Sequence, residues 1–144
     1  MNDTTRTIDS LNRLLAIVYR SFPTYLADAS PWTHEGDERA AETLKNIVLD
    51  QQASAVRIVE LILQLGGRFE PGEYPMEYTD THFLSLDFLL KELLRYQRRD
   101  VAAIERIVAE LEGHREAREL AEETLGAERA HLEAIEALVA QPAA

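Results

Sequence analysis

Apolar residues recur with helical spacing over four long stretches of the chain, at about 7–28, 37–65, 81–112 and 116–140. When the last stretch is placed on a helical wheel at ~100° per residue, most of its apolar side chains share one face. These residues are Ala117, Leu120, Ala121, Thr124, Leu132, Ile135, Leu138 and Val139. The pattern predicts an all-α fold built from four helices.

Two of the predicted helices carry signals for a break or an end. Pro23 lies inside the first helical pattern, which predicts a kink or short break near Phe22. Ser30 and Pro31 then have the residue types of an N-cap and a first helical position. The pair at 66–67 is Gly-Gly, which suits the left-handed position that ends a helix.

A long connection follows the second predicted helix, over residues 66–79. It contains three residues that break regular structure: Pro71, Gly72 and Pro75. Consecutive antiparallel helices need only ~2–8 linking residues. A connection of this length, at ~3.3 Å per residue, can span ~46 Å, whereas the second helix at ~1.5 Å per residue is ~44 Å long. We therefore expect a crossover along the whole bundle, with Asp80 or Thr81 capping the third helix.

The composition narrows the class of protein. A chain of 144 residues predicts one domain over 1–144. The formal charge of −11 argues against a nucleic-acid or anionic-membrane partner, since phosphate groups are bound mainly by clustered Lys and Arg. The sequence contains no run of about 18 apolar residues, so no membrane span is predicted. The first residues show no secretory signal, so a cytoplasmic location is the default expectation.

The second predicted helix has more apolar surface than one core-facing stripe requires. Beside its core face lies a second apolar band made of Leu49, Val56 and Leu63. Such width is typical of a helix that is buried on two sides. We therefore predict a homodimer in which this band lies at the subunit interface.

Two ionisable residues lie on the apolar face of the last helix. Glu128 lies near the middle of that face and His131 near its edge. A carboxylate in an apolar stripe is costly unless it is paired, hydrogen-bonded or bound to a metal. The other inward polar residues decide which of these applies.

Three segments are informative when taken together: the end of the second helix, Leu63-Gln64-Leu65-Gly66-Gly67, the crossing loop, and Glu128-Arg129-Ala130-His131. With them the chain resembles the ferritin-like superfamily, which includes bacterioferritins, rubrerythrins and Dps-type cages. The segment 79–86 also looks like small bacterial ferritin-like proteins of undefined function. The resemblance implies a four-helix bundle with a long crossover between its second and third helices. It also implies a di-iron site with carboxylates from all four helices and Glu-x-x-His from two of them.

The ligand pattern of that superfamily is incomplete in this chain. Glu128 and His131 match the pattern on the fourth helix. The matching positions on the other helices are held by Val18, Gln51, Ser54 and Gln97, with Asp100 one turn from Gln97. A Gln amide is a poor ligand for cations that favour carboxylate and imidazole. The resemblance therefore implies a degenerate di-iron site rather than a complete ferroxidase centre.

Two interpretations of these residues remain open. In the first, Gln51, Ser54, Gln97, Glu128 and His131 form a buried, hydrogen-bonded polar cluster that fixes helix register. In the second, Glu128 and His131 bind iron or manganese with Asp50 or Glu92, although the wheel turns both of these residues away from the core centre. The remaining histidines lie at element ends, where caps or surface positions are expected: His34, His82 and His114.

The two interpretations lead to two functional hypotheses. The first is a ferritin-like protein without ferroxidase activity, cofactor or catalytic residue, which acts through dimer or oligomer assembly or through partner binding. The alternative is an iron- or manganese-binding protein of iron storage or oxidative-stress handling, with a reduced metal site. Neutral residues at positions 18, 51 and 97 favour the first hypothesis.

Overall fold

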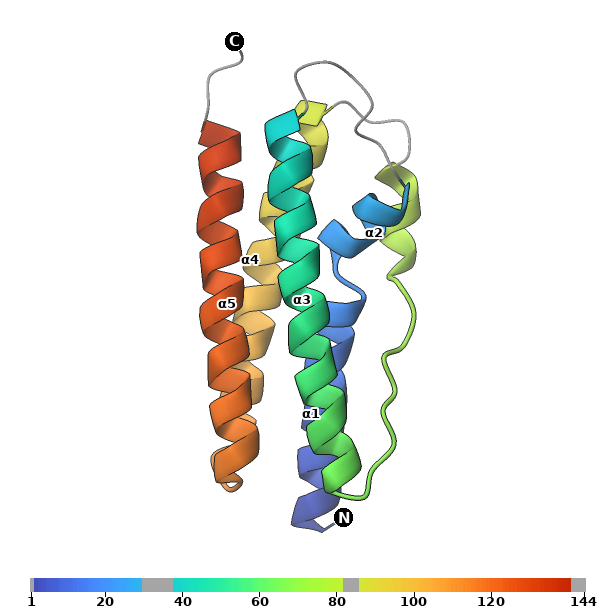
Figure 1. Ribbon diagram of the computed structural model, residues 1–144, viewed down its shortest axis with the longest axis vertical. Coiled ribbons are helices and arrows are strands. Elements are labelled where there is room, and N and C mark those ends of the chain that lie inside the picture. The colour runs from blue at the N-terminus through green and yellow to red at the C-terminus, as the bar shows by residue number, and fades with distance from the viewer. Residues whose placement is uncertain (1, 30–37, 82–85, 141–144) are drawn as a thin grey trace.

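The computed structural model describes residues 2–29, 38–81 and 86–140, which form α-helices and one short 3₁₀ helix. The elements in chain order are α1 (Asp3–Tyr19), α2 (Phe22–Ala29), α3 (Glu38–Gln64), the 3₁₀ helix η1 (Met76–Thr81), α4 (Leu86–Glu110) and α5 (Arg115–Ala140). Figure 1 shows α1, α3, α4 and α5 side by side as a bundle, with α2 set at an angle beyond the end of α1. The all-α four-helix bundle that the sequence predicts is confirmed.

The first helical pattern is divided into α1 and α2. The side chain of Asn2 caps α1 by accepting a hydrogen bond of 2.8 Å from the Thr5 amide, so this helix begins at Asp3 rather than near residue 7. The break falls just before Phe22, where the Ser21 hydroxyl accepts a hydrogen bond of 3.2 Å from the Thr24 amide. Ser21 is therefore the N-cap of α2. The expected cap at Ser30 and Pro31 lies outside the described residues.

The two glycines that follow α3 meet two different requirements. Gly66 adopts φ of 81°, and the Gly67 amide donates to the Ile62 carbonyl at 3.0 Å, which is the pattern of a helix that ends in a left-handed residue. Gly67 lies against α1, because a Cβ there would be 2.8 Å from two side-chain carbons of Ile8. A larger residue at 67 would therefore force the Ile8 side chain to shift.

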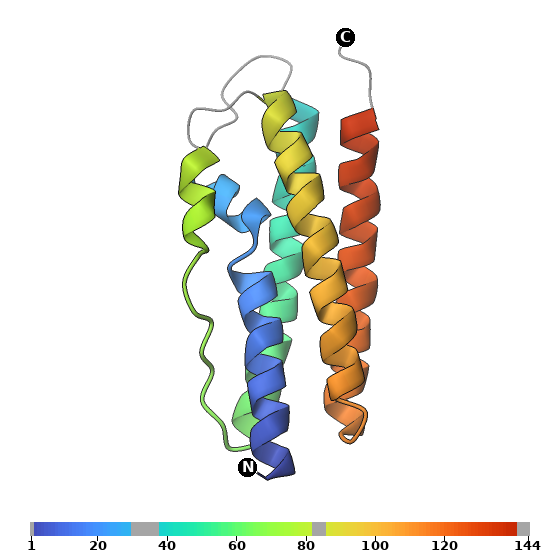
Figure 2. The same ribbon diagram turned by 180° about the vertical axis from the view of Figure 1, so that it is seen from behind.

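The segment after α3 crosses the whole bundle. Figures 1 and 2 show it running along the outside from the end of α3 toward the other end of the bundle, as far as η1, which lies beside α2. The long crossover is therefore confirmed. The expectation of an irregular loop up to residue 79 is wrong from residue 76 onward, because Met76–Thr81 forms a 3₁₀ helix. Asp80 and Thr81, the expected caps of the third helix, belong to this turn, and the residues that follow, 82–85, lie outside the described residues. Tyr78 anchors this turn, with its side chain 2% exposed and its amide donating to the Pro75 carbonyl.

The buried apolar residues form two clusters, one toward each end of the bundle. The first lies between α1, α3, α4 and α5 and includes Leu14, Ile58 and Ile104. The second lies toward the other end and is rich in aromatic rings, with Phe22 and Tyr78 at a centroid distance of 4.9 Å. Most of the buried residues between the two clusters on α3, α4 and α5 are polar. None of the described helices has a stretch apolar and long enough to span a bilayer.

Candidate functional site

A layer of buried polar side chains separates the two apolar clusters. Its members come from the α1–α2 break, α3, α4 and α5: Ser21, Gln51, Ser54, Gln97, Asp100, Glu128 and His131. Each is at most 9% exposed. Buried polar groups destabilise a core unless they find partners, so the contacts within this polar layer determine what it can do.

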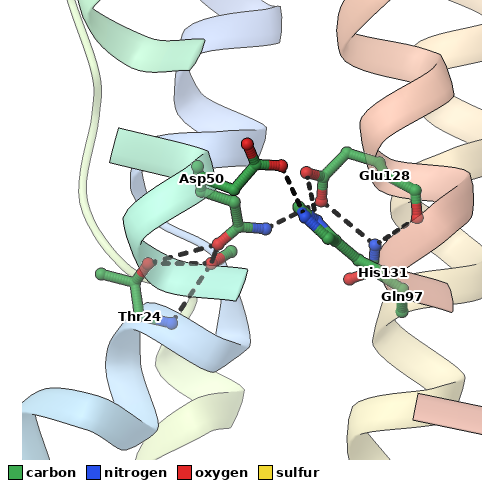
Figure 3. Close-up of polar contacts among 7 residues, drawn as sticks. Thr24, Asp50, Gln97, Glu128 and His131 are labelled. Carbon is green, nitrogen blue, oxygen red and sulfur yellow. Dashed lines mark hydrogen bonds and ion pairs between the residues drawn. The ribbon is translucent and has the colours of Figure 1, made fainter. Parts of the chain in front are cut away.

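Glu128 is the centre of the polar layer. Its Oε1 atom accepts hydrogen bonds from the amide of Gln51 at 2.8 Å and from the amide of Gln97 at 3.1 Å. The Gln97 amide also donates to the backbone carbonyl of Glu128 at 3.0 Å. Figure 3 shows Gln97 and Glu128 with a dashed line between them, and the Gln97 amide is directed toward the carboxylate. Hydrogen bonds to a charged acceptor are the stronger kind, at about 1.5–3 kcal/mol each.

Gln51 links Glu128 to the break between α1 and α2. Its Oε1 atom accepts a hydrogen bond of 2.6 Å from the Ser21 hydroxyl and lies 3.4 Å from the Thr24 hydroxyl. These donors fix the amide so that its nitrogen faces Glu128. Ser21 was not among the residues that the sequence predicted, although its place before Phe22-Pro23 is a capping signal.

His131 lies between two carboxylates. Its Nε2 atom is 2.7 Å from Asp50 Oδ2, and its Nδ1 atom is 2.8 Å from Glu128 Oε2. The second contact is an ion pair rather than a directed hydrogen bond, since neither atom has a well-aligned partner among the described residues. Burial lowers the pKa of His131, but the two carboxylates outweigh it and raise the pKa above 6.5. The imidazolium therefore contributes stability below pH 6.5, and this contribution is lost as the pH rises through the raised pKa.

The position of Asp50 corrects an expectation from the helical wheel. Asp50 lies on the outer edge of α3 with 48% of its side chain exposed, yet it reaches the ring of His131 on α5. The other residue that the wheel turned away, Glu92, pairs instead with Arg95 at 2.7 Å. Of the two carboxylates considered beside His131, only Asp50 contacts it.

Asp100 is a second buried carboxylate of the polar layer. It lies on α4, one turn after Gln97, and is 9% exposed. Burial raises its pKa to about 7, with the nearby charge of Glu128 acting in the same direction and Arg99 opposing both. The sequence placed Asp100 near the site but gave no indication that its side chain is buried.

Asp100→Asn is expected to stabilise the protein above pH 7. A pKa that rises from 3.8 to about 7 on folding means that the folded state binds the proton more tightly, so stability falls as the pH rises between these values. At ~1.4 kcal/mol per pKa unit, the loss is about 4 kcal/mol. Urea denaturation at pH 4, 5.5 and 8 should show a flatter pH dependence for the variant. Parallel curves for parent and variant would contradict the assignment.

The other predicted residues do not join the network. Ser54 is fully buried, but its hydroxyl has no hydrogen-bond partner among the described residues. Val18 is 1% exposed and belongs to the first apolar cluster. His114 caps α5, with its Nδ1 atom accepting from the Ala117 amide at 3.1 Å. His34 and His82 lie outside the described residues.

The residues of the polar layer do not fit a di-iron centre. Such a centre takes carboxylates from all four helices, whereas Val18, Gln51 and Gln97 hold three of the expected positions here. Both ring nitrogens of His131 face carboxylates, and two amide groups donate to Glu128 where a cation would have to bind. Within the described parts of the chain, no group of three or more His, Cys, Asp or Glu residues is arranged to hold a metal ion.

Both the sequence and the fold of this chain are similar to those of known proteins. The family model described as Ferritin-like domain matches residues 8–143. The fold is similar to a crystal structure of ferritin like, diiron-carboxylate proteins from Bacillus anthracis str. Ames, with a TM-score of 0.77. The match covers 96% of this chain and 99% of that chain at 18% sequence identity, which shows a shared fold alone. No curated protein gives a significant match to the sequence.

Proposed function

The chain belongs to the ferritin-like domain family, and we propose that it is a non-ferroxidase member that acts by assembly with copies of itself or by binding a protein partner. One observation carries the proposal. The amides of Gln51 and Gln97 donate to Glu128 at positions where the family pattern has carboxylate ligands. Amide donors stabilise an anion there and oppose a cation.

In this proposal the polar layer has a structural role. Gln51 on α3, Gln97 on α4 and Glu128 on α5 are hydrogen-bonded at one level of the bundle, and Ser21 ties the α1–α2 break to them. A buried network that is satisfied only in one arrangement disfavours slipped arrangements of the helices. The proposed result is a bundle of fixed register that presents a fixed outer surface.

The outer surface of α3 supports assembly. Leu49, Val56 and Leu63 are more than half exposed, at 55%, 57% and 54%. Beside them a groove of about 450 Å³ lies between α1, α3 and the crossover segment, with Tyr19 and Phe69 among its lining residues. Exposed apolar residues that gather on one face of a helix mark interaction sites. We propose that this α3 face forms the homodimer interface.

The solution mass tests the assembly proposal. The parent is expected to have twice the mass of the 16.3 kDa chain in sedimentation or light scattering. Val56→Lys should give a monomer, because it places two charges at the centre of the proposed interface. Met76→Lys is the matched control, since Met76 is an 85% exposed apolar residue on η1, and it should leave the dimer intact. A parent that stays monomeric at about 0.1 mM would contradict the proposal.

The alternative is an iron- or manganese-binding protein with a reduced site. It is favoured by the contact of Asp50 with His131 and by the fold shared with a structure described as a ferritin like, diiron-carboxylate protein. This alternative requires the Gln51 and Gln97 amides to release Glu128. Bound metal after purification would therefore favour it over the structural role.

A further inference from the structure

We propose that a small cavity where α1, α2, α3 and the crossover segment meet binds a phosphate group, with Arg20 as its main ligand. The volume of this Arg20 cavity is about 240 Å³, roughly eight times the ~30 Å³ that a water molecule takes in the liquid. It is therefore large enough for a phosphate ion with several waters. Its lining combines aromatic, aliphatic and hydrogen-bonding side chains: Val18, Tyr19, Arg20, Thr24, Gln52 and Tyr74.

The charge of this lining is opposite in sign to that of the whole chain. Arg20 is the one charged residue among the six that line the cavity, although the chain carries 26 Asp and Glu residues against 15 Lys and Arg residues. Other arginines pair with a Glu side chain, as Arg99 does with Glu77 at 2.7 Å. Arg20 has no such partner among the described residues. Its charge is therefore left for an anionic ligand.

The groups that hold Arg20 in place do not neutralise it. Its central carbon Cζ lies 4.6 Å from the ring centroid of Tyr19 and 5.2 Å from that of Tyr74, within the range of cation–π contacts. Its Nε atom donates to the Gly72 carbonyl at 2.8 Å. This bond leaves the N–H groups of the two terminal nitrogens to donate elsewhere. A guanidinium fixed in this way presents a planar fork that matches two oxygens of a phosphate group.

Two neutral side chains of the lining can donate to the same anion. The Thr24 hydroxyl lies 3.4 Å from Gln51 Oε1, which is longer than an ordinary O–H···O bond of ~2.5–3.0 Å. The Ser21 oxygen, 3.0 Å from that hydroxyl, already accepts the Thr24 amide. The Gln52 side chain is exposed and forms no hydrogen bond with another described residue. Together with Arg20 these donors face no carboxylate in the lining, which favours an oxyanion over a cation.

The inference does not depend on the proposed assembly. Tyr19 and Gln52 also line the groove beside the α3 face, so the Arg20 cavity lies at the edge of the proposed interface. Arg20 and Thr24 do not line that groove. A monomeric parent is therefore still expected to bind phosphate, and the solution mass is recorded beside each titration so that the two results are read separately.

An NMR titration with inorganic phosphate at pH 7.5 tests the proposal. The Gly72 amide signal should shift and saturate with a dissociation constant on the order of 1 mM. Arg20→Gln should raise this constant about tenfold or more, because it removes the charged donor. Thr24→Val keeps the shape of the side chain and should raise it about threefold. Arg106→Gln removes an exposed arginine of α4 and should leave the constant unchanged.

Saturable shifts that weaken in Arg20→Gln and Thr24→Val, but not in Arg106→Gln, would support the site. Methyl phosphate, titrated in the same way, then distinguishes a phosphate monoester from free phosphate by which of them binds more tightly. Shifts that do not saturate below about 20 mM phosphate, or equal constants for Arg20→Gln and Arg106→Gln, would overturn the site. Acetate that binds as tightly as phosphate would overturn the choice of ligand. If circular dichroism shows that Arg20→Gln does not fold, the comparison of Thr24→Val with Arg106→Gln decides.

Discussion

Replacing Gln51 and Gln97 together with leucine is expected to lower the free energy of unfolding by about 3–5 kcal/mol, the usual loss when a buried charge loses its partners. Glu128 would keep a buried carboxylate but lose both amide donors. Ser21 would lose its acceptor on Gln51. Urea denaturation at pH 7.5 and a fixed protein concentration, with the parent in parallel, measures the change. A loss below about 1 kcal/mol would contradict the structural role of the polar layer.

Further replacements separate lost hydrogen bonds from lost packing. Adding Glu128→Leu and His131→Leu to the double variant removes the buried pair that has lost its hydrogen-bond donors, and the stability should recover most of the loss. Gln64→Leu makes the same chemical change at an exposed position and should alter stability by no more than about 0.5 kcal/mol. If the variant with all four substitutions is less stable than the double variant, the loss of unfolding free energy in the double variant comes from packing and not from the unpaired carboxylate.

Restoring the family ligand set is expected to create a metal site. The variant carries Val18→Glu, Gln51→Glu, Ser54→His and Gln97→Glu beside the native Glu128 and His131. The four substituted positions are all buried and at most 1% exposed, and together with Glu128 and His131 they reproduce the pattern of a di-iron bundle. The variant should bind about two ferrous ions per chain under anaerobic conditions, and thermal unfolding should show that the ions stabilise it.

The matched control keeps the amides. A variant with Val18→Gln and Ser54→His retains Gln51 and Gln97 and should bind no ferrous ion, because Glu128 remains the only carboxylate among the family positions. If the restored variant folds, as judged by circular dichroism, and still binds no metal, these positions are not the equivalents of the family ligands.

The sequence predicted the features that depend on local geometry: the direction of a side chain from its own helix, and the length of a connection. Helical spacing placed Gln51, Gln97 and Glu128 on inward faces, and all three are at most 1% exposed. The Gly66-Gly67 pair and the length of the segment after it predicted the crossover, because both depend on local backbone geometry and chain length.

The features that the sequence did not predict depend on the distance between a side chain and its partner on a neighbouring helix. A helical wheel gives the direction of Cβ but not the distance to the next helix, so it disfavoured the contact from Asp50 to His131 that the structure shows. For the same reason Ser54, which points inward, was expected in the network, although its short side chain meets no hydrogen-bond partner in the part of the chain that the structure describes. Ser21 was missed because its role requires the exact place of the α1–α2 break.

The metal content of the purified protein tests the structural role of the polar layer most directly. The parent, purified without chelator from cells grown with added iron and manganese, should carry less than about 0.1 metal ion per chain. It should bind none on anaerobic titration with ferrous iron, alongside the restored variant as the positive control. Near-stoichiometric iron or manganese in the parent, absent when Glu128→Ala and His131→Ala are combined, would show that the polar layer is a metal site and contradict its role as a hydrogen-bonded structural element.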